Sequence, residues 1–416
     1  MPSLGNAILW ITLSPISEQI GFLYNQNQLI VNMSSLVFML LYIFVNFPSN
    51  YVLGLNCKNG VLLGAAFTII GSWIRVLVNK SFWYVILGQI LGAIGQPFIL
   101  NAPAKIATEW FIPKQRPAAI AALALINMVG IGIGFLIPSI FVENTKDMQI
   151  GKNQVYNLMF WEAIIISAGC APIFILFKNK PKTPPSHSAN TEKMSFKQSI
   201  PVVFANKDYI ILLIAFGCVL GNFSAISTLM NYYLIPYNLN NQQISFCGAT
   251  FIVSGLIGST IFSIIIEKTG KYKKILIFSS FFAMLSQGLQ IGMILTYNIW
   301  YILLGIFFFG FFAIPLIPLS MDFACELTFP VCEAFSSGLI YACGQFVGLV
   351  LILISDLVFD LKNKTQVIYS NCIGMGFMVL SVLFYCIIGE NLLRKTEENK
   401  NQLKYINNSN SELLIS

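Results

Sequence analysis

Hydrophobic and polar positions follow one another along this chain in long blocks. Apolar runs of about 20 residues, the length that crosses the hydrocarbon of a bilayer, alternate with short polar segments. The pattern predicts an all-α membrane protein with twelve membrane-spanning helices. The predicted spans are residues 3–24, 32–55, 60–78, 83–110, 118–142, 155–177, 209–236, 244–266, 275–296, 299–325, 335–360 and 366–389.

Composition agrees with this pattern. The 416 residues are 56% hydrophobic and only 10% charged, whereas globular proteins carry about 25% charged residues. The nine cysteines lack the CxxC spacing of metal and redox sites, and the single histidine, His187, falls in a hydrophilic loop. We therefore expect no metal and no other cofactor. The net charge of +7 comes from loop residues, so it does not indicate a nucleic-acid partner.

The positive charges predict the orientation in the membrane. If both termini are cytoplasmic, only six of the 24 Lys and Arg side chains fall on the outer side. The opposite orientation reverses this ratio, so the positive-inside rule predicts cytoplasmic termini. The six outer residues are Arg75, Lys80, Lys146, Lys152, Lys362 and Lys364.

Two polar segments suggest the domain organisation. Residues 178–208, rich in Pro, Ser and Lys, predict a cytoplasmic linker between a six-helix half at 1–177 and a second at 209–389. The Asn-rich residues 390–416 predict a disordered cytoplasmic tail.

A weak internal repeat relates the two halves. A shift of 217 residues lays 107–128 over 324–345 and brings Glu109 onto Glu326. The match falls where a six-plus-six repeat about the membrane normal places it, which predicts the major facilitator fold.

Small residues predict where helices pack closely. Gly130, Gly132 and Gly134 lie within one apolar span, where they let another backbone approach. With Gly255 and Gly258 of the eighth span, they are expected to form a seam between the halves.

Polar residues well inside the spans are the candidate binding residues, because substrates of this fold bind near the midplane between the halves. Ser, Thr and Asn also form hydrogen bonds between membrane helices, so a structural role stays open for them. The candidates are Asn6, Trp10, Ser14, Ser17, Gln89, Gln96, Ser224, Ser227, Thr228, Asn231, Tyr341 and Gln345.

Trp10 is the most informative of these residues. Tryptophan in membrane proteins prefers the interfacial belts. Trp10, however, belongs to a polar stripe along one face of the first span, which also contains Asn6, Ser14 and Ser17. An indole face in that position suits a cationic ligand.

Charged side chains gather near the predicted helix ends. None occupies the mid-membrane position expected of a proton-coupling carboxylate, so the sequence favours facilitated diffusion over proton symport. At the cytoplasmic ends, Glu109 and Glu326 are expected to pair with Lys58 and with Lys271 or its neighbours and to latch a gate; solvated end charges are the alternative. The other charges near helix ends are Glu18, Arg75, Lys105, Glu162, Asp322 and Asp356.

Several motifs resemble the feline leukaemia virus subgroup C receptor family of major facilitator transporters. They are NA-x-x-WI from Asn6, GQ-x6-Q-x-FIL from Gly88, KIATEWFIPK from Lys105, AIST-L-x-N from Ala225, and E-L-T-F-P-x-x-E-x-x-SSGL, which runs from Glu326 into GQ-x-x-G. They are spread over nearly the whole chain.

The resemblance implies a binding site. Choline and ethanolamine transporters of the family hold the ammonium group with a Trp from helix 1, a Tyr from helix 7 and a Gln from each of helices 5 and 11. Trp10 and Gln345 match two of these positions, while Met128 and Ser224 stand at the other two. Tyr232 or Tyr233 is expected to replace part of the missing aromatic wall. The expected substrate-binding residues are Trp10, Gln345, Met128, Ser224, Asn6, Gln96 and Asn231.

The sequence thus predicts a monomeric carrier, in the plasma membrane or an organelle membrane, that moves a small organic solute by alternating access. The expected substrate is a choline- or ethanolamine-like amine moved as a uniport. A different nutrient, vitamin-like or haem, is an alternative, although no span contains a histidine. A transport-dead receptor or complex subunit is another, which the polar stripes disfavour. Nothing in the sequence supports an enzyme.

Overall fold

The computed structural model describes residues 1–112, 115–178, 196–331, 333–360 and 363–390, together with 392, 393 and 396. Within these residues the regular structure is entirely helical. Among the described residues, eleven helices are long and apolar enough to cross a membrane. The predicted span missing from this set is the first one.

The first span is missing because it is broken into three pieces. They are α1 (Pro2–Ile11), η1 (Ser14–Ile16) and α2 (Ser17–Tyr24), which together cover the predicted span 3–24. Pro15 has no backbone N–H to donate to the Ile11 carbonyl, and α1 ends at Ile11. Counting this broken helix, the twelve predicted helices are present.

The remaining helices of the N-terminal half follow the predicted spans closely. The fourth span is also broken, because α5 ends at Leu100 and α6 begins at Ala102, on either side of Asn101. The helices are α3 (Gln28–Leu55), α4 (Cys57–Arg75) with η2 (Val76–Asn79), α5 (Trp83–Leu100), α6 (Ala102–Trp110), α7 (Arg116–Phe141) and α8 (Met148–Leu176).

The C-terminal half repeats this arrangement, and its tenth span breaks between α13 and α14 beside Pro315. The helices are α10 (Lys207–Leu234) with η5 (Ile235–Tyr237), α11 (Asn241–Thr269), α12 (Tyr272–Ile294), α13 (Ile299–Ala313), α14 (Leu316–Thr328), α15 (Glu333–Val358) and α16 (Lys364–Ile387).

The predicted linker is partly helical, because α9 (Phe196–Ala205) lies within 178–208. Residues 179–195, which include His187, and nearly all of the predicted tail at 390–416 lie outside the described residues.

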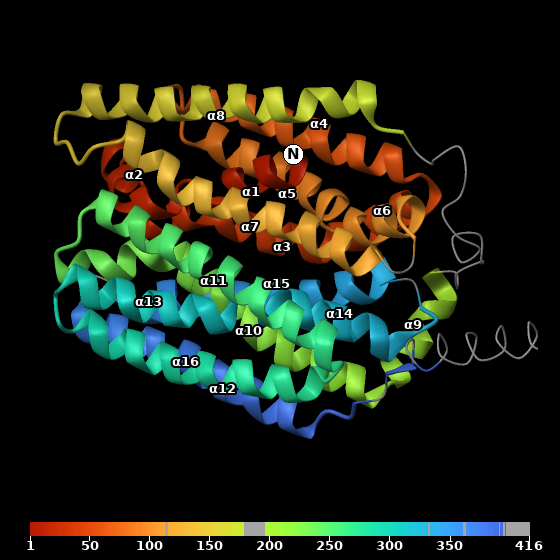
Figure 1. Cartoon of the computed structure of the whole chain (residues 1–416). Coiled ribbons are helices and arrows are strands. Elements are labelled where there is room, and N and C mark those ends of the chain that lie inside the picture. The colour runs from red at the N-terminus through yellow and green to blue at the C-terminus, as the bar shows by residue number, and fades with distance from the viewer. Residues whose placement is uncertain are drawn as a thin grey trace, which may run out of the picture.

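The two halves form two layers. In Figure 1 the red-to-yellow helices of the first half lie above the green-to-blue helices of the second, and all run roughly parallel. Contacts across the boundary are made mainly by α7 with α11 and by α3 with α15. These two helix pairs frame the space between the halves.

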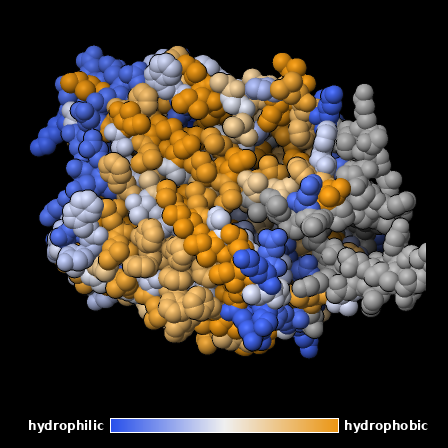
Figure 2. Space-filling model, viewed as in Figure 1, coloured by the Kyte–Doolittle hydropathy of each residue, from blue (hydrophilic) through white to orange (hydrophobic). Residues whose placement is uncertain are grey.

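The surface is that of a protein surrounded by lipid. Figure 2 shows a broad hydrophobic band across the middle of the molecule, with hydrophilic residues towards its ends. Large apolar side chains such as Ile140 and Trp300 are each 75% exposed. Exposed apolar area on this scale indicates a membrane interface.

The glycines of α7 allow the close packing expected of them, but the seam is not the predicted one. A Cβ on Gly130 would lie 2.5 Å from the Leu4 carbonyl oxygen, so this glycine packs against α1. Gly132 faces Ile252 of the other half. Gly255 and Gly258 pack on Phe311 of α13 and on Ile314, which follows it, within their own half, so the idea that they join the halves is wrong.

Candidate substrate site between the halves

An outer contact joins the halves near the break in the first helix. Ser14 Oγ donates to the carbonyl oxygens of Ser227 and Thr228, at 2.5 and 3.0 Å. Asn231 is fully buried; its Nδ2 donates to the Pro15 carbonyl at 2.6 Å, and its Oδ1 accepts from Ser17 Oγ at 3.1 Å. Because η1 interrupts the helix, its polar groups are presented sideways to α10.

Two further hydrogen-bonded groups extend this outer contact. Asn32 Nδ2 donates to both carboxylate oxygens of Asp356 at 2.9 and 2.8 Å, and Gln28 Nε2 adds a bond of 2.6 Å. Asn241 Nδ2 donates to Asn144 Oδ1 at 2.7 Å. Each bond connects one half with the other, on the side of the membrane that the charge distribution predicts to be external.

An inner contact joins the same two helices, α3 and α15, at positions further from the outer contact. The rings of Tyr42 in α3 and Tyr341 in α15 have centroids 5.0 Å apart. Tyr42 Oη donates to Asn101 Oδ1 at 2.8 Å, and Asn101 Nδ2 donates to Asn46 Oδ1 at 2.7 Å. A Cβ on Gly338 would lie 2.8 Å from Asn46 Oδ1, so the backbone of α15 packs directly on this group.

Between the two contacts, Trp10 meets an aromatic side chain of the opposite half. Its ring centroid lies 6.5 Å from that of Phe223 in α10, with the planes tilted by 35°. Phe223 in turn lies 5.5 Å from Phe251. The sequence pointed to Tyr232 or Tyr233 as the second aromatic group. The residue that faces Trp10 is Phe223 instead, while Tyr233 bonds to Ser370 inside the C-terminal half.

Ser224 and Gln345 belong to the same region. A Cβ on Gly348 would lie 3.2 Å from Ser224 Cβ and 3.4 Å from Met39 Sδ. Gln345 lies one turn before Gly348 on the same side of α15. It is only 4% exposed, and its Oε1 has no hydrogen-bond partner among the described residues. A buried amide oxygen of this kind is costly unless a ligand or water supplies a donor.

The other expected binding residues are held by protein contacts to different degrees. Gln96 in α5 is buried, and its Oε1 also lacks a partner in the described chain. Asn6 Nδ2 donates to Thr68 Oγ1 and to the Gly92 carbonyl, at 3.1 and 2.8 Å, so it ties α1 to α4 and α5. Met128 in α7 is buried at 8% exposure. Asn231 belongs to the outer contact.

A buried ion pair lies within the N-terminal half, where the sequence suggested end charges. Arg75 Nη1 lies 3.3 Å from Glu162 Oε2, and both side chains are 1% exposed. Thr12 Oγ1, at the break after α1, lies 2.5 Å from Glu162 Oε1. Glu162 stands at the middle of the 29-residue helix α8, further from the helix end than the sequence suggested. Its charge is compensated by Arg75.

The expected gate residues lie at the other end of the molecule. Lys105 Nζ lies 3.8 Å from Glu109, four residues away in α6, and is 2.6 Å from the Gly54 carbonyl oxygen. Glu326, near the end of α14, is 8% exposed. Lys58 lies in the first turn of α4, and Lys271 directly precedes α12. The latch between these groups remains a prediction.

Comparison with known proteins places this architecture in a class. The family model of the Major Facilitator Superfamily matches residues 3–331. A bacterial homologue of the human lysosomal transporter Spinster has the same fold, with a TM-score of 0.70 at 13% identity over 94% of this chain and 96% of that one. The Escherichia coli fucose:proton symporter FucP gives 0.66 at 13% identity, over 93% and 98% of the two chains. The chain is a transporter of the Major Facilitator Superfamily.

Sequence relatives narrow the class. The choline/ethanolamine transporter FLVCR1 of Felis catus is 31% identical over 414 residues, which cover 94% of this chain and 71% of that protein. The choline/ethanolamine transporter flvcr2a of Danio rerio is 33% identical over 376 residues, covering 86% and 78% of the two chains. The chain belongs to the feline leukaemia virus subgroup C receptor family.

Proposed function

We propose that this protein carries a choline- or ethanolamine-like amine across the membrane by facilitated diffusion. The observation that carries the proposal is the Trp10 ring, buried at the boundary of the halves and opposite Phe223, with the unpartnered Oε1 of Gln345 in the same region. Aromatic faces attract a quaternary ammonium group, and an amide oxygen accepts a hydrogen bond from a hydroxyl or primary ammonium group. The names of the sequence relatives support the same substrate class.

The spacing of the aromatic rings supports alternating access. At 6.5 Å the rings of Trp10 and Phe223 are in direct contact, so an ammonium group cannot lie between them. A substrate that touches both rings requires the halves to separate here. The outer and inner contacts are the places where such a rocking motion breaks and reforms bonds.

The remaining residues define the pocket's character in this proposal. Met128 offers a polarisable apolar surface to methyl groups. Ser224 packs beside Gly348, which leaves the aromatic role at α10 to Phe223. We further propose a monomer with cytoplasmic termini in the plasma membrane, without a cofactor or catalytic activity. Charge distribution supports the orientation.

Uptake of radiolabelled choline by cells that express the chain tests the proposal. Trp10→Ala is expected to lower uptake about 30-fold, because a desolvated cation–π contact contributes about 2 kcal/mol. Trp161→Ala is the matched control, since Trp161 is 49% exposed on the outside of α8 and should leave uptake unchanged.

Two outcomes would overturn parts of the proposal. Wild-type protein at the cell surface without choline or ethanolamine uptake would exclude the amine substrate. A different small nutrient, which the combination of Met128 and Ser224 favours, would then be sought with a solute screen. Equal uptake by wild type and Trp10→Ala would instead keep the substrate and exclude the proposed site.

A further inference from the structure

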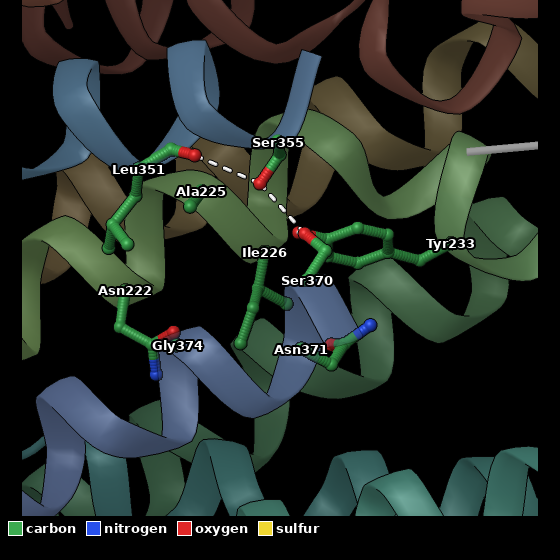
Figure 3. A pocket seen from close by; sticks show the side chains of 9 residues that line it. All are labelled: Asn222, Ala225, Ile226, Tyr233, Leu351, Ser355, Ser370, Asn371 and Gly374. Carbon is green, nitrogen blue, oxygen red and sulfur yellow. Dashed lines mark hydrogen bonds between the residues drawn. The ribbon is translucent and has the colours of Figure 1, made fainter. Parts of the chain in front are cut away.

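A small polar cavity lies inside the C-terminal half, apart from the site at Trp10 and Gln345. Its volume of about 10 Å³ is close to the minimum that one water-sized particle occupies. Three helices, α10, α15 and α16, form its walls (Figure 3). The polar residues that line it are Asn222, Tyr233, Ser355, Ser370 and Asn371.

The hydroxyl protons around this cavity are already used. Ser355 Oγ donates to the Leu351 carbonyl at 2.9 Å and lies 2.7 Å from Ser370 Oγ, as Figure 3 shows. In the arrangement in which the Ser355 proton goes to Leu351, Ser370 is the donor to Ser355. In the same arrangement Tyr233 Oη, 2.8 Å from Ser370 Oγ, donates to Ser370. The three hydroxyl groups therefore offer only lone pairs to an occupant.

Of the two amides that line the cavity, Asn371 has an unpartnered oxygen among the described residues. Asn371 Nδ2 donates to the Val367 carbonyl at 2.9 Å, whereas Asn371 Oδ1 is buried without a partner among the described residues. Figure 3 shows the oxygen and nitrogen of this amide pointing in opposite directions. Asn222 is paired with Gln287: its Nδ2 donates to Gln287 Oε1 at 2.9 Å, and its Oδ1 accepts from Gln287 Nε2 at 3.4 Å. A Cβ on Gly374 would lie 2.3 Å from Asn222 Oδ1, so this glycine leaves room for that oxygen.

We propose that this cavity binds a sodium ion. The lining offers oxygen lone pairs but few hydrogen-bond donors. Such a lining suits a cation, which needs no donor, and hard cations such as Na⁺ bind oxygen ligands. The lining residues carry no formal charge, which favours a monovalent ion over a divalent one. Asp356, next to Ser355 in α15, accepts only from the neutral Asn32 and Gln28 and forms no ion pair with a described residue.

The bound ion would connect the helices that carry the candidate substrate residues. The cavity is built from α10, which also carries Phe223 and Ser224, and from α15, which carries Gln345. A bound sodium ion would thus fix the positions of α10 and α15 relative to α16. This is a stabilising role within one half, and it does not require the ion to move with the organic solute.

Direct binding of ²²Na⁺ to the purified protein tests the proposal without any organic substrate. Wild type should bind the ion saturably and with little competition from K⁺. Asn371→Leu, which keeps the side-chain size and removes the unpartnered oxygen, should lower the affinity at least tenfold. Ser381→Ala is the matched control: Ser381 is buried on the same helix with an unpartnered Oγ, outside the cavity.

Thermal unfolding gives a second readout, which also shows whether each variant is folded. Replacing N-methyl-glucamine with Na⁺ at about ten times its dissociation constant should raise the Tm of wild type and Ser381→Ala by about 1–2 °C. Asn371→Leu should unfold cooperatively with a Tm that does not respond to Na⁺. No saturable ²²Na⁺ binding to wild type, or a sodium response kept by Asn371→Leu, would overturn the proposal and assign the cavity to water.

Discussion

The buried pair of Arg75 and Glu162 makes a strong prediction about stability. Both side chains are 1% exposed, and the pair rests on a single contact of 3.3 Å. Nε and Nη2 of Arg75 have no partner among the described residues. Removing one charge from a buried pair costs about 3–5 kcal/mol, because the other charge stays buried without compensation. Glu162→Gln should therefore destabilise the protein by this amount.

The expected change in Tm follows from the size of the chain. An unfolding entropy of about 2.1 cal/mol/K per residue gives about 0.9 kcal/mol/K for 416 residues. A loss of about 3–5 kcal/mol then lowers the Tm by about 3–6 °C. Size-exclusion chromatography with fluorescence detection, after heating in detergent, measures this shift.

A double variant distinguishes the loss of charge compensation from other effects of the substitution. Arg75→Met with Glu162→Leu removes both charges, and buried pairs replaced by apolar residues are often neutral or more stable. Its Tm should lie within about 1 °C of wild type or above it. Glu267→Gln, at an exposed position of α11, serves as the control. If Glu162→Gln unfolds at the same temperature as that control, Glu162 is not the charged partner of Arg75.

Three further predictions follow from the packing and the contacts. Gly130→Ala forces a Cβ to within 2.5 Å of the Leu4 carbonyl and should cost about 1–3 kcal/mol, measured as a lower Tm, whereas Gly54→Ala has open space and should be neutral. Glu326→Lys should slow uptake and change the accessibility of the cytoplasmic side; unchanged values of both would remove the gate hypothesis. Asn231→Leu removes bonds of the outer contact, so a cysteine introduced at Ser35 in a cysteine-free background should react faster with an external impermeant maleimide. An unchanged rate would mean that Asn231 does not hold this contact closed.

The fold was accessible from the sequence because long apolar runs and short polar connections determine membrane topology directly. The departures are local. The first span was expected to be one helix, but Pro15 divides it, and length alone does not reveal such a break. The helix α9 was missed because its surroundings are polar and contain prolines. Glu162 was placed near a helix end because Lys152, Asn153 and Gln154 resemble a loop, although they form the first turns of α8.

The candidate site was accessible only in part. Trp10 and Gln345 stand out because a tryptophan and an amide are unusual inside apolar helices. Phe223 gives no such signal, since many positions of α10 are apolar and the choice of the one that meets Trp10 depends on how the halves pack. The same holds for Asn231, whose polar stripe predicted a ligand contact and whose amide is used between the halves.

The outer contact has a consequence for how the carrier responds to its surroundings. It is made of hydrogen bonds between uncharged groups, except at Asp356, whose carboxylate accepts from the amides of Asn32 and Gln28. Salt screens pairs of opposite charges, but it has little effect on bonds of this kind. Opening exchanges each bond for one to water, at a net cost of about 1 kcal/mol. External opening should therefore depend on temperature far more than on the salinity outside the cell.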